Sequence, residues 1–191
     1  MRVLGIDTET GGLDPSKSDV LTVGVALADI TSNGISWVAQ FSHNVKHDVY
    51  RVTPKAMEIN GLRIANLENA RTLSQIWRQI SPNINRNPNI VGHNVYFDID
   101  FLHGIPFESH KKPRNVFDTY AIANVLKAAR IPYKKLNLAA VCRYHNIDFD
   151  ESEAHEALYD AIKSVEVLHA QLSLIKSGYL STLEVFNGET L

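Results

Sequence analysis

The fold is decided near the start of the chain, where residues 2–10 read RVLGIDTET. Arg2 to Asp7 has the apolar pattern of a short β-strand that ends in polar residues. Asp7 and Glu9 stand two positions apart, and side chains at that spacing on an extended segment point to the same face. The stretch therefore predicts a strand that ends in a pair of carboxylates, which can grip one cation between them.

Turn signals divide the next segment into strands. Residues 11–15, with two glycines, an aspartate and a proline, mark a turn. Residues 20–30 are rich in Val, Leu and Ala, and the Asn33-Gly34 pair is a strong signal for a tight turn after which residues 35–41 can return as a paired strand. We therefore expect the chain to begin with three antiparallel strands.

Short apolar runs and helical patterns alternate along the rest of the chain. A helix is expected to begin at Pro54 and to end at Gly61, since proline suits a helix start and glycine a helix end. The other expected elements are helices over residues 73–80, 96–103, 119–129, 136–144 and 156–176, and strands over residues 89–92 and 116–118. A hairpin start followed by alternating strands and helices predicts an α/β fold with a mixed sheet flanked by helices.

The composition fits one globular domain. The chain has 191 residues, 45% of them hydrophobic and 21% charged, which suits a sizeable core. Cys142 is the only cysteine and follows a helical apolar pattern, so we expect a core residue and a reducing compartment. A net charge of −2 gives no global attraction to phosphate. With no signal-peptide pattern and no apolar run near the roughly 20 residues that span a bilayer, we expect a cytoplasmic protein without a membrane partner.

Four acidic residues and one histidine fall where strand and helix ends can bring them together: Asp7, Glu9, Asp98, Asp160 and His155. Four carboxylates in one crevice repel strongly unless cations neutralise them. Two divalent ions held ~3.5–4 Å apart by carboxylates activate a water and stabilise the leaving oxygen of a phosphodiester. His155 precedes Asp160 by five residues at the start of the last helix, from which its imidazole can reach the attacking water as general base.

Three motifs carry a family resemblance. DTET at residues 7–10, HNVYFD at residues 93–98 and HEALYDA at residues 155–161 resemble the three exonuclease motifs of the DEDD superfamily, in the right order. A histidine five residues before the last aspartate resembles the DEDDh branch, which includes polymerase proofreading subunits, ribonuclease T and oligoribonucleases. The other branch has a tyrosine four residues before that aspartate, where this chain has Glu156.

The resemblance implies a ribonuclease H-like fold with a mixed five-stranded sheet, and a 3′–5′ exonuclease domain over residues 1–177. It implies two Mg²⁺ or Mn²⁺ ions held by Asp7, Glu9, Asp98 and Asp160, His155 as general base, and release of nucleoside 5′-monophosphates. By the same resemblance the substrate-binding residues are Thr8, Thr10, Gly12, Leu13, Met57, Asn60, Asn94, Phe97 and His155. The chain departs from the family pattern at Asn60, where a histidine is common, and at Gly11, where a threonine is usual.

The substrate is expected to be the 3′ end of a single strand, since the terminal nucleotide must be splayed into a narrow crevice. Single-stranded DNA is favoured over RNA, although the sequence does not decide between them. A polymerase or replication partner and a homodimer both stay open. Residues 178–191 are expected to dock on the domain or on a partner, and the source is expected to be bacterial or viral.

Two other functions compete with the exonuclease hypothesis. Phosphatases of the haloacid dehalogenase type also have two acidic residues, two positions apart, after an apolar strand. Their second acid is an aspartate, where this chain has Glu9. A binding module on the same fold would perform no catalysis, since a fold does not fix a function. All four carboxylates and the histidine are present, which favours the enzyme.

Several residues also have a purely structural interpretation. His93 is expected to be a hydrogen-bonded histidine at a strand end. The Asp118-Thr119 pair resembles a recurrent pair of the DEDD superfamily, where we expect a role in the fold. Phe97 and Met57 are as compatible with the core as with substrate contact. The basic residues favour an exposed loop over a contact with phosphate: Lys111, Lys112, Arg114, Lys134 and Lys135. We interpret Asp19, Asp100 and Asp148 as ordinary solvated or capping carboxylates.

Overall fold

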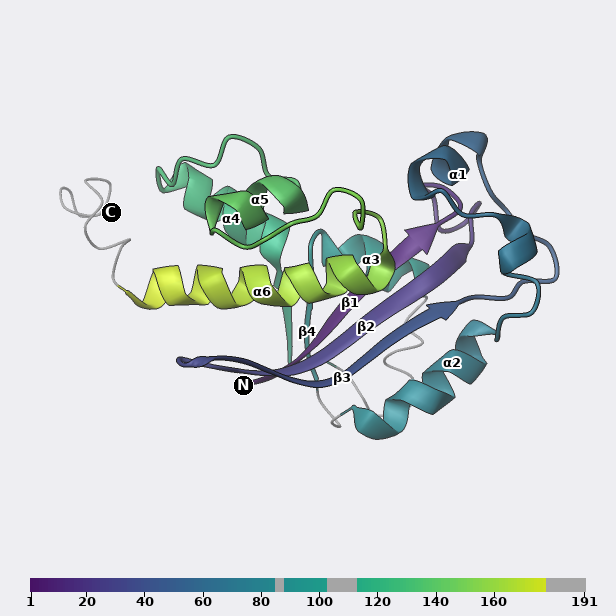
Figure 1. The fold of residues 1–191 in the computed structure, drawn as a ribbon, viewed down its shortest axis with the longest axis horizontal. Helices are drawn as coiled ribbons and strands as arrows, with labels where there is room; N and C mark the ends of the chain where they lie inside the picture. Colours follow the sequence, from purple (N-terminus) through teal and green to yellow (C-terminus); the bar gives the residue numbers. More distant parts are fainter. Residues whose placement is uncertain (85–87, 103–112, 178–191) are drawn as a thin grey trace.

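The computed structural model describes residues 1–84, 88–102 and 113–177. A five-stranded sheet in the order β3-β2-β1-β4-β5 forms its centre (Figure 1). The strands are β1 (Arg2–Thr10), β2 (Val20–Thr31), β3 (Gly34–Asn44), β4 (Asn89–Gly92) and β5 (Asn115–Asp118). The fold class expected from the sequence, α/β with a mixed five-stranded sheet flanked by helices, is thereby confirmed.

The sheet is mixed because its two halves are connected differently. β1, β2 and β3 pair antiparallel, as expected, whereas β4 pairs parallel to β1 and β5 parallel to β4. The turn predicted at Asn33-Gly34 joins β2 to β3, and Gly34 has a positive φ of 137°. Parallel neighbours need crossover connections, and helices supply them.

Sequence signals set the helix bounds closely. The helices are α1 (Pro54–Asn60), α2 (Leu73–Ile80), α3 (Val95–Phe101), α4 (Thr119–Ala128), α5 (Leu138–Tyr144) and α6 (Ala157–Lys176). The Thr53 side chain caps the start of α1, and Gly61 ends it in the left-handed conformation with φ 64°. Every helix expected from the sequence is present, with ends within two residues of the expected ones.

The two faces of the sheet bury different helices. Leu4 and Ile6 of β1 belong to one core cluster, which includes α2 residues and Phe101 of α3. Val3, one position out of step, belongs to another cluster with Val165 and Leu168 of α6. Figure 1 shows α6 lying along the sheet on the side away from α2, with α4 and α5 beside it. The odd-numbered side chains of β1 therefore share the α6 face.

Glycines let α6 approach the sheet closely. A Cβ added at Gly24 in β2 would come within 2.1 Å of the Ala157 backbone, and one at Gly5 would come within 2.8 Å of the Ala161 carbonyl oxygen. No side chain fits at either place. This contact seats the first turn of α6, which carries Asp160, against β1 and β2.

The burial of several residues can be compared with the sequence-based expectations. Cys142 is buried, as expected for a core residue, and Arg114, Lys134 and Lys135 are exposed. Lys111, Lys112 and the segment 178–191 lie outside the described residues. Among the helices of the described part of the chain, none is long and apolar enough to cross a membrane.

Candidate active site

A cavity of about 640 Å³ opens at the end of β1 and brings together nearly all the predicted site residues. The predicted residues that line it are Asp7, Thr8, Glu9, Thr10, Gly12, Leu13, Asn60, Asn94, Phe97, Asp98, His155 and Asp160. Met57 is half-buried and is the one predicted residue outside this lining. The lining residues that sequence reasoning did not assign to the site are Asp14, Lys17, Ser18, Thr53, Lys55, Ala56, Ile59 and His93.

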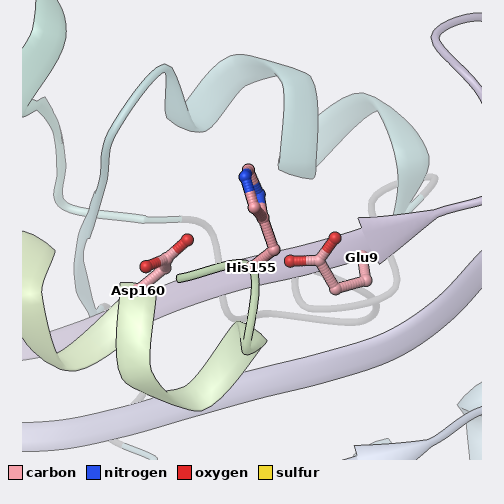
Figure 2. Close-up of side chains that lie close together, drawn as sticks. All are labelled: Glu9, His155 and Asp160. Atoms are coloured by element: carbon pink, nitrogen blue, oxygen red, sulfur yellow. The ribbon is translucent and has the colours of Figure 1, made fainter. Parts of the chain in front are cut away.

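Three of the residues form a compact cluster. Glu9 comes from β1, His155 from the loop before α6, and Asp160 from the first turn of that helix (Figure 2). One carboxylate oxygen of each acid and one ring nitrogen of His155 all lie within 4.8 Å of one another. His155 has a positive φ of 68°, a conformation uncommon for residues other than glycine. The cluster has the donor atoms and the spacing that a divalent cation needs.

Asp98 approaches the cluster from α3. It is only 3% exposed, and its Oδ1 accepts hydrogen bonds from the backbone N–H of Thr8 at 2.8 Å and from the Thr8 hydroxyl at 2.7 Å. The Thr8 side chain is itself buried. Thr8 therefore orients the carboxylate of Asp98.

Burial raises the pKa of all four carboxyl groups, and repulsion by the other acids of the cluster adds to the rise for Asp7 and Glu9. Desolvation is the largest cause in each case, and it raises the pKa of Glu9 to about 8, of Asp98 to about 7 and of Asp160 to about 6. The pKa of Asp7 is raised well above its usual value by burial and then by the charges of Asp98, Asp160 and Glu9. Within the described residues these four acids are opposed mainly by the charge of His155, which lowers the pKa of Asp160, so a bound cation would relieve their repulsion.

An unpartnered oxygen of Asp160 also indicates a bound cation. Oδ1 of Asp160 is buried and has no hydrogen-bond partner among the described residues. A buried carboxylate oxygen without a partner is costly. The donor set of four carboxylates and this free oxygen fit a hard divalent cation such as Mg²⁺ or Mn²⁺.

Hydrogen bonds connect two residues that line the cavity, His93 and Asn94, to the Asp118-Thr119 pair outside it. The two ring nitrogens of His93 contact the Thr119 hydroxyl at 2.9 Å and the Leu136 carbonyl oxygen at 2.7 Å. Asp118 caps α4 and accepts a bond from the Asn94 backbone N–H at 2.9 Å. His93 is a hydrogen-bonded histidine and the pair serves the fold, as the sequence predicted.

Phe97 lies between the core and the cavity, so its contact with substrate stays a prediction. Its side chain packs against the core, with its ring centroid 4.8 Å from that of Phe101, and it also lines the cavity. Across the opening, Leu13 is 88% exposed. Asn60 donates to the Thr10 carbonyl oxygen at 3.3 Å, so the residue in the usual histidine position ties α1 to the end of β1.

Asp19 is buried and paired with Arg51, which the sequence did not predict. The interpretation of Asp19 as an ordinary solvated carboxylate is wrong, because it is 6% exposed and bonds to Arg51 through two guanidinium nitrogens at 2.9 and 2.6 Å. The Arg51 bonds and charge hold the pKa of Asp19 below its usual value, against the burial that raises it. The partners are 32 positions apart, so no local pattern pointed to the pair.

Comparison with protein families agrees with the geometry. The family model RNase_T, described as Exonuclease, matches residues 4–168, which include all five predicted catalytic residues. The chain belongs to this family. It is therefore an enzyme, a 3′–5′ exonuclease that acts on nucleic acid and depends on metal.

Individual members of the RNase_T family are only moderately similar. Ribonuclease T of Shewanella denitrificans is 27% identical over 173 residues, which cover 85% of this chain and 76% of that protein. Ribonuclease T of Hahella chejuensis is 29% identical over 174 residues, with 85% and 79% covered. Both relatives are bacterial.

Solved structures share the fold. E. coli exonuclease I in complex with a dT13 oligonucleotide superposes with a TM-score of 0.74 at 18% identity over 94% of this chain. Another structure of exonuclease I gives a TM-score of 0.73 at 19% identity. This RNase_T family chain spans 42% of the length of either exonuclease I chain. The likeness establishes the ribonuclease H-like fold.

Proposed function

We propose that this chain removes nucleotides one at a time from the 3′ end of a single strand by a two-metal mechanism and releases nucleoside 5′-monophosphates. Asp7, Glu9, Asp98 and Asp160 are the metal ligands in this proposal, and His155 is the general base. The single observation that carries it is the gathering of four carboxyl groups of raised pKa around one cavity, with an unpartnered buried oxygen on Asp160.

Each residue has a defined task. Two bound Mg²⁺ or Mn²⁺ ions would supply the positive charge that acidifies a water and stabilises the leaving oxygen. Asp7 and Glu9 share the face of β1 toward α6, so they can bind from the same side as Asp160. Asp98 is held in one orientation by Thr8. The exposed imidazole of His155 stands at the edge of the cluster, where it can take the proton of the attacking water.

The walls of the cavity suit one terminal nucleotide. Leu13 and Ile59 are exposed and apolar and line the cavity, so they offer surface to a base. The backbone of Thr10 and Gly12 and the side chains of Asn94 and Phe97 complete the contact surface in this proposal. Met57, outside the lining, keeps only an indirect role through α1.

The proposed substrate is a single strand, and DNA is favoured over RNA. Support comes from the fold shared with exonuclease I, whose structure holds a dT13 oligonucleotide. RNA is the second candidate, because both similar family members named above are ribonuclease T. A polymerase or replication partner, a homodimer, a cytoplasmic location, a domain that ends at residue 177 and a docking role for residues 178–191 stay predictions.

The test is degradation of 5′-labelled single-stranded DNA and RNA oligomers with Mg²⁺ or Mn²⁺, beside EDTA and an Asp7→Ala control. We expect a ladder that shortens from the 3′ end, needs the metal and is absent in the control. The polymer that shortens faster identifies the substrate. If the folded chain gives no ladder on either polymer with both metals supplied, the proposal fails in favour of the binding module.

A further inference from the structure

One wall of the cavity has no hydrophobic core of its own. Helix α1 contributes Lys55, Ala56, Ile59 and Asn60 to the lining, yet none of its residues is buried. In Figure 1 the helix stands beyond the end of the sheet. Burial of side chains therefore does not fix its position, and hydrogen bonds at its ends must.

The anchor before α1 is Arg51. Its Nε and one terminal nitrogen donate to Oδ1 of Asp19 at 2.9 and 2.6 Å, and its backbone N–H donates to Oδ2 at 2.7 Å. The Asp19 side chain is 7% exposed, whereas that of Arg51 is 47% exposed. A charge-assisted fork of this kind fixes geometry as well as adding energy.

The same guanidinium also holds the opposite wall. Arg51 donates to the carbonyl oxygens of Ser16 at 2.8 Å and Ser18 at 3.3 Å. These residues belong to the loop that carries Gly12, Leu13 and Lys17 into the cavity. Arg51 thus bridges the two sides of the opening. Among the described residues, no other arginine donates to the carbonyl oxygens of this loop.

Backbone bonds complete the junction. The Gly11 N–H donates to the Asp19 carbonyl oxygen at 2.8 Å, the Asp19 N–H to that of Arg51 at 3.1 Å, and the Thr53 N–H to that of Gly11 at 2.6 Å. The loop, the start of β2 and the entry to α1 therefore meet at one point, and the Arg51–Asp19 pair lies at its centre.

We propose that Arg51 is a positioning residue: paired with Asp19, it sets the distance between the residue 11–18 loop and α1, and so the affinity for the terminal nucleotide. The inference rests on the proposed function and deepens it. Arg51 is not among the residues that line the cavity, so it acts through the walls that it joins. Its loss widens the binding surface and leaves the carboxylate cluster in place.

The chain offers a matched control in the Arg2–Asp29 pair. There the guanidinium also forms a fork, with distances of 3.0 and 2.6 Å to the two carboxylate oxygens. This pair joins β1 to β2 at the strand ends away from the cavity, and both side chains are more than a third exposed. Arg2→Gln therefore removes a similar pair far from the cavity.

The experiment compares wild type, Arg51→Gln, Arg51→Lys, the double variant Asp19→Asn/Arg51→Gln, and Arg2→Gln. We measure kcat and KM on a single-stranded oligomer, binding of a fluorescein-labelled strand in EDTA by anisotropy, and the melting temperature. Arg51→Lys keeps a charge beside Asp19 and so protects the fold, but its one nitrogen cannot span the acceptors that three guanidinium nitrogens reach. The double variant leaves no unpaired buried charge.

The expected result is a KM raised about tenfold in each Arg51 variant, the loss of roughly one well-placed hydrogen-bonded contact, with kcat within about twofold of wild type. The double variant should regain melting temperature without regaining KM. The inference is overturned if Arg51→Lys binds the strand as wild type does, if Arg2→Gln raises KM equally, or if the double variant restores KM along with stability.

The two proposals fail separately. A wild-type chain that binds the strand but does not cut it rejects the exonuclease proposal, while the anisotropy series still decides the role of Arg51. A wild-type chain that neither cuts nor binds overturns both.

Discussion

Thr8 and Asp98 are joined by two hydrogen bonds that end on one oxygen: the backbone N–H and the hydroxyl of Thr8 donate to Oδ1 of Asp98 at 2.8 and 2.7 Å. The contact links β1 to α3 across 90 positions of sequence. Burial raises the pKa of Asp98 to about 7, and the two Thr8 bonds act in the opposite direction. Thr8 therefore helps to keep the carboxylate of Asp98, a proposed metal ligand, ionised and oriented.

Replacing Thr8 by valine should weaken metal binding. Thr8→Val keeps the shape and the backbone bond but removes the hydroxyl bond to Asp98. Hydrogen bonds to charged groups contribute about 1.5–3 kcal/mol, so we expect the Mg²⁺ concentration for half-maximal activity to rise at least about tenfold. A metal titration of exonuclease activity measures the shift.

The matched control is Thr8→Ser, which retains the hydroxyl. Its Mg²⁺ concentration for half-maximal activity should stay within about threefold of the wild-type value, since only a methyl group is lost. Equal metal requirements for Thr8→Val and wild type would show that the hydroxyl does not act on Asp98.

Stability without metal should depend on pH. The folded-state pKa values of Glu9, Asp98 and Asp160 are raised to about 8, 7 and 6, whereas the unfolded chain has ordinary values near 4. Between about pH 4 and pH 8 the folded state thus binds more protons than the unfolded state, so the free energy of unfolding falls as pH rises through this window. The part of the loss that comes from these three groups is complete once Glu9 ionises near pH 8.

Thermal melts in EDTA and in Mg²⁺ measure this effect. We expect the metal-free melting temperature to be lower at about pH 8.5 than at about pH 5, and the gain from Mg²⁺ to be larger at the higher pH. Asp7→Asn should reduce both differences, because it removes one of the repelling charges. A metal-free melting temperature that rises over the window would contradict the proposed electrostatics.

The sequence predicted the elements well because local signals mark their ends. Thr53 and Gly61 cap α1, and the Asn33-Gly34 turn sets the first hairpin. The site was predictable for a different reason. Asp7 and Glu9 share a face of one strand, and the motif spacing placed Asp98 and His155 at element starts.

Long-range partners could not be predicted in this way. Nothing near Asp19 in sequence shows that Arg51 will fold against it, and aspartates before an apolar strand are usually solvated. Gly24 carried a usable signal, since a glycine inside an apolar strand indicates a close backbone approach. The identity of the approaching segment, at Ala157, could not be predicted without the fold.

His155 has two possible tasks that one variant separates. Its ring nitrogen lies within 4.8 Å of carboxylate oxygens of Glu9 and Asp160, so it has the position of a ligand as well as that of a base. As general base, its loss in His155→Ala should lower kcat about 10²–10⁴-fold and leave the affinity for Mn²⁺ nearly unchanged. Single-turnover rates and Mn²⁺ binding by calorimetry give the two quantities. A large fall in Mn²⁺ affinity would instead make His155 a metal ligand.

Lys17 and Lys55 should bind the phosphate backbone of the strand. They are the two lysines in the lining of this acidic cavity, one on each wall, and their side chains are 80% and 73% exposed. Lys17 pairs with the exposed carboxylate of Asp14 and Lys55 with that of Glu58, and such surface pairs contribute little energy. A phosphate can therefore displace either partner.

Lys17→Gln/Lys55→Gln should raise KM for a single-stranded oligomer, and the raised value should depend less on salt. Each phosphate contact contributes about 0.7 to the slope of log affinity against log salt for single strands, so the double variant should lose about 1.4. Lys176→Gln, at the far end of α6, supplies the control and should keep the wild-type slope. Because kcat reports the carboxylate cluster, it should be nearly equal in all three proteins at saturating strand. A slope unchanged in the double variant would place the path of the strand elsewhere than between the two walls that Arg51 joins.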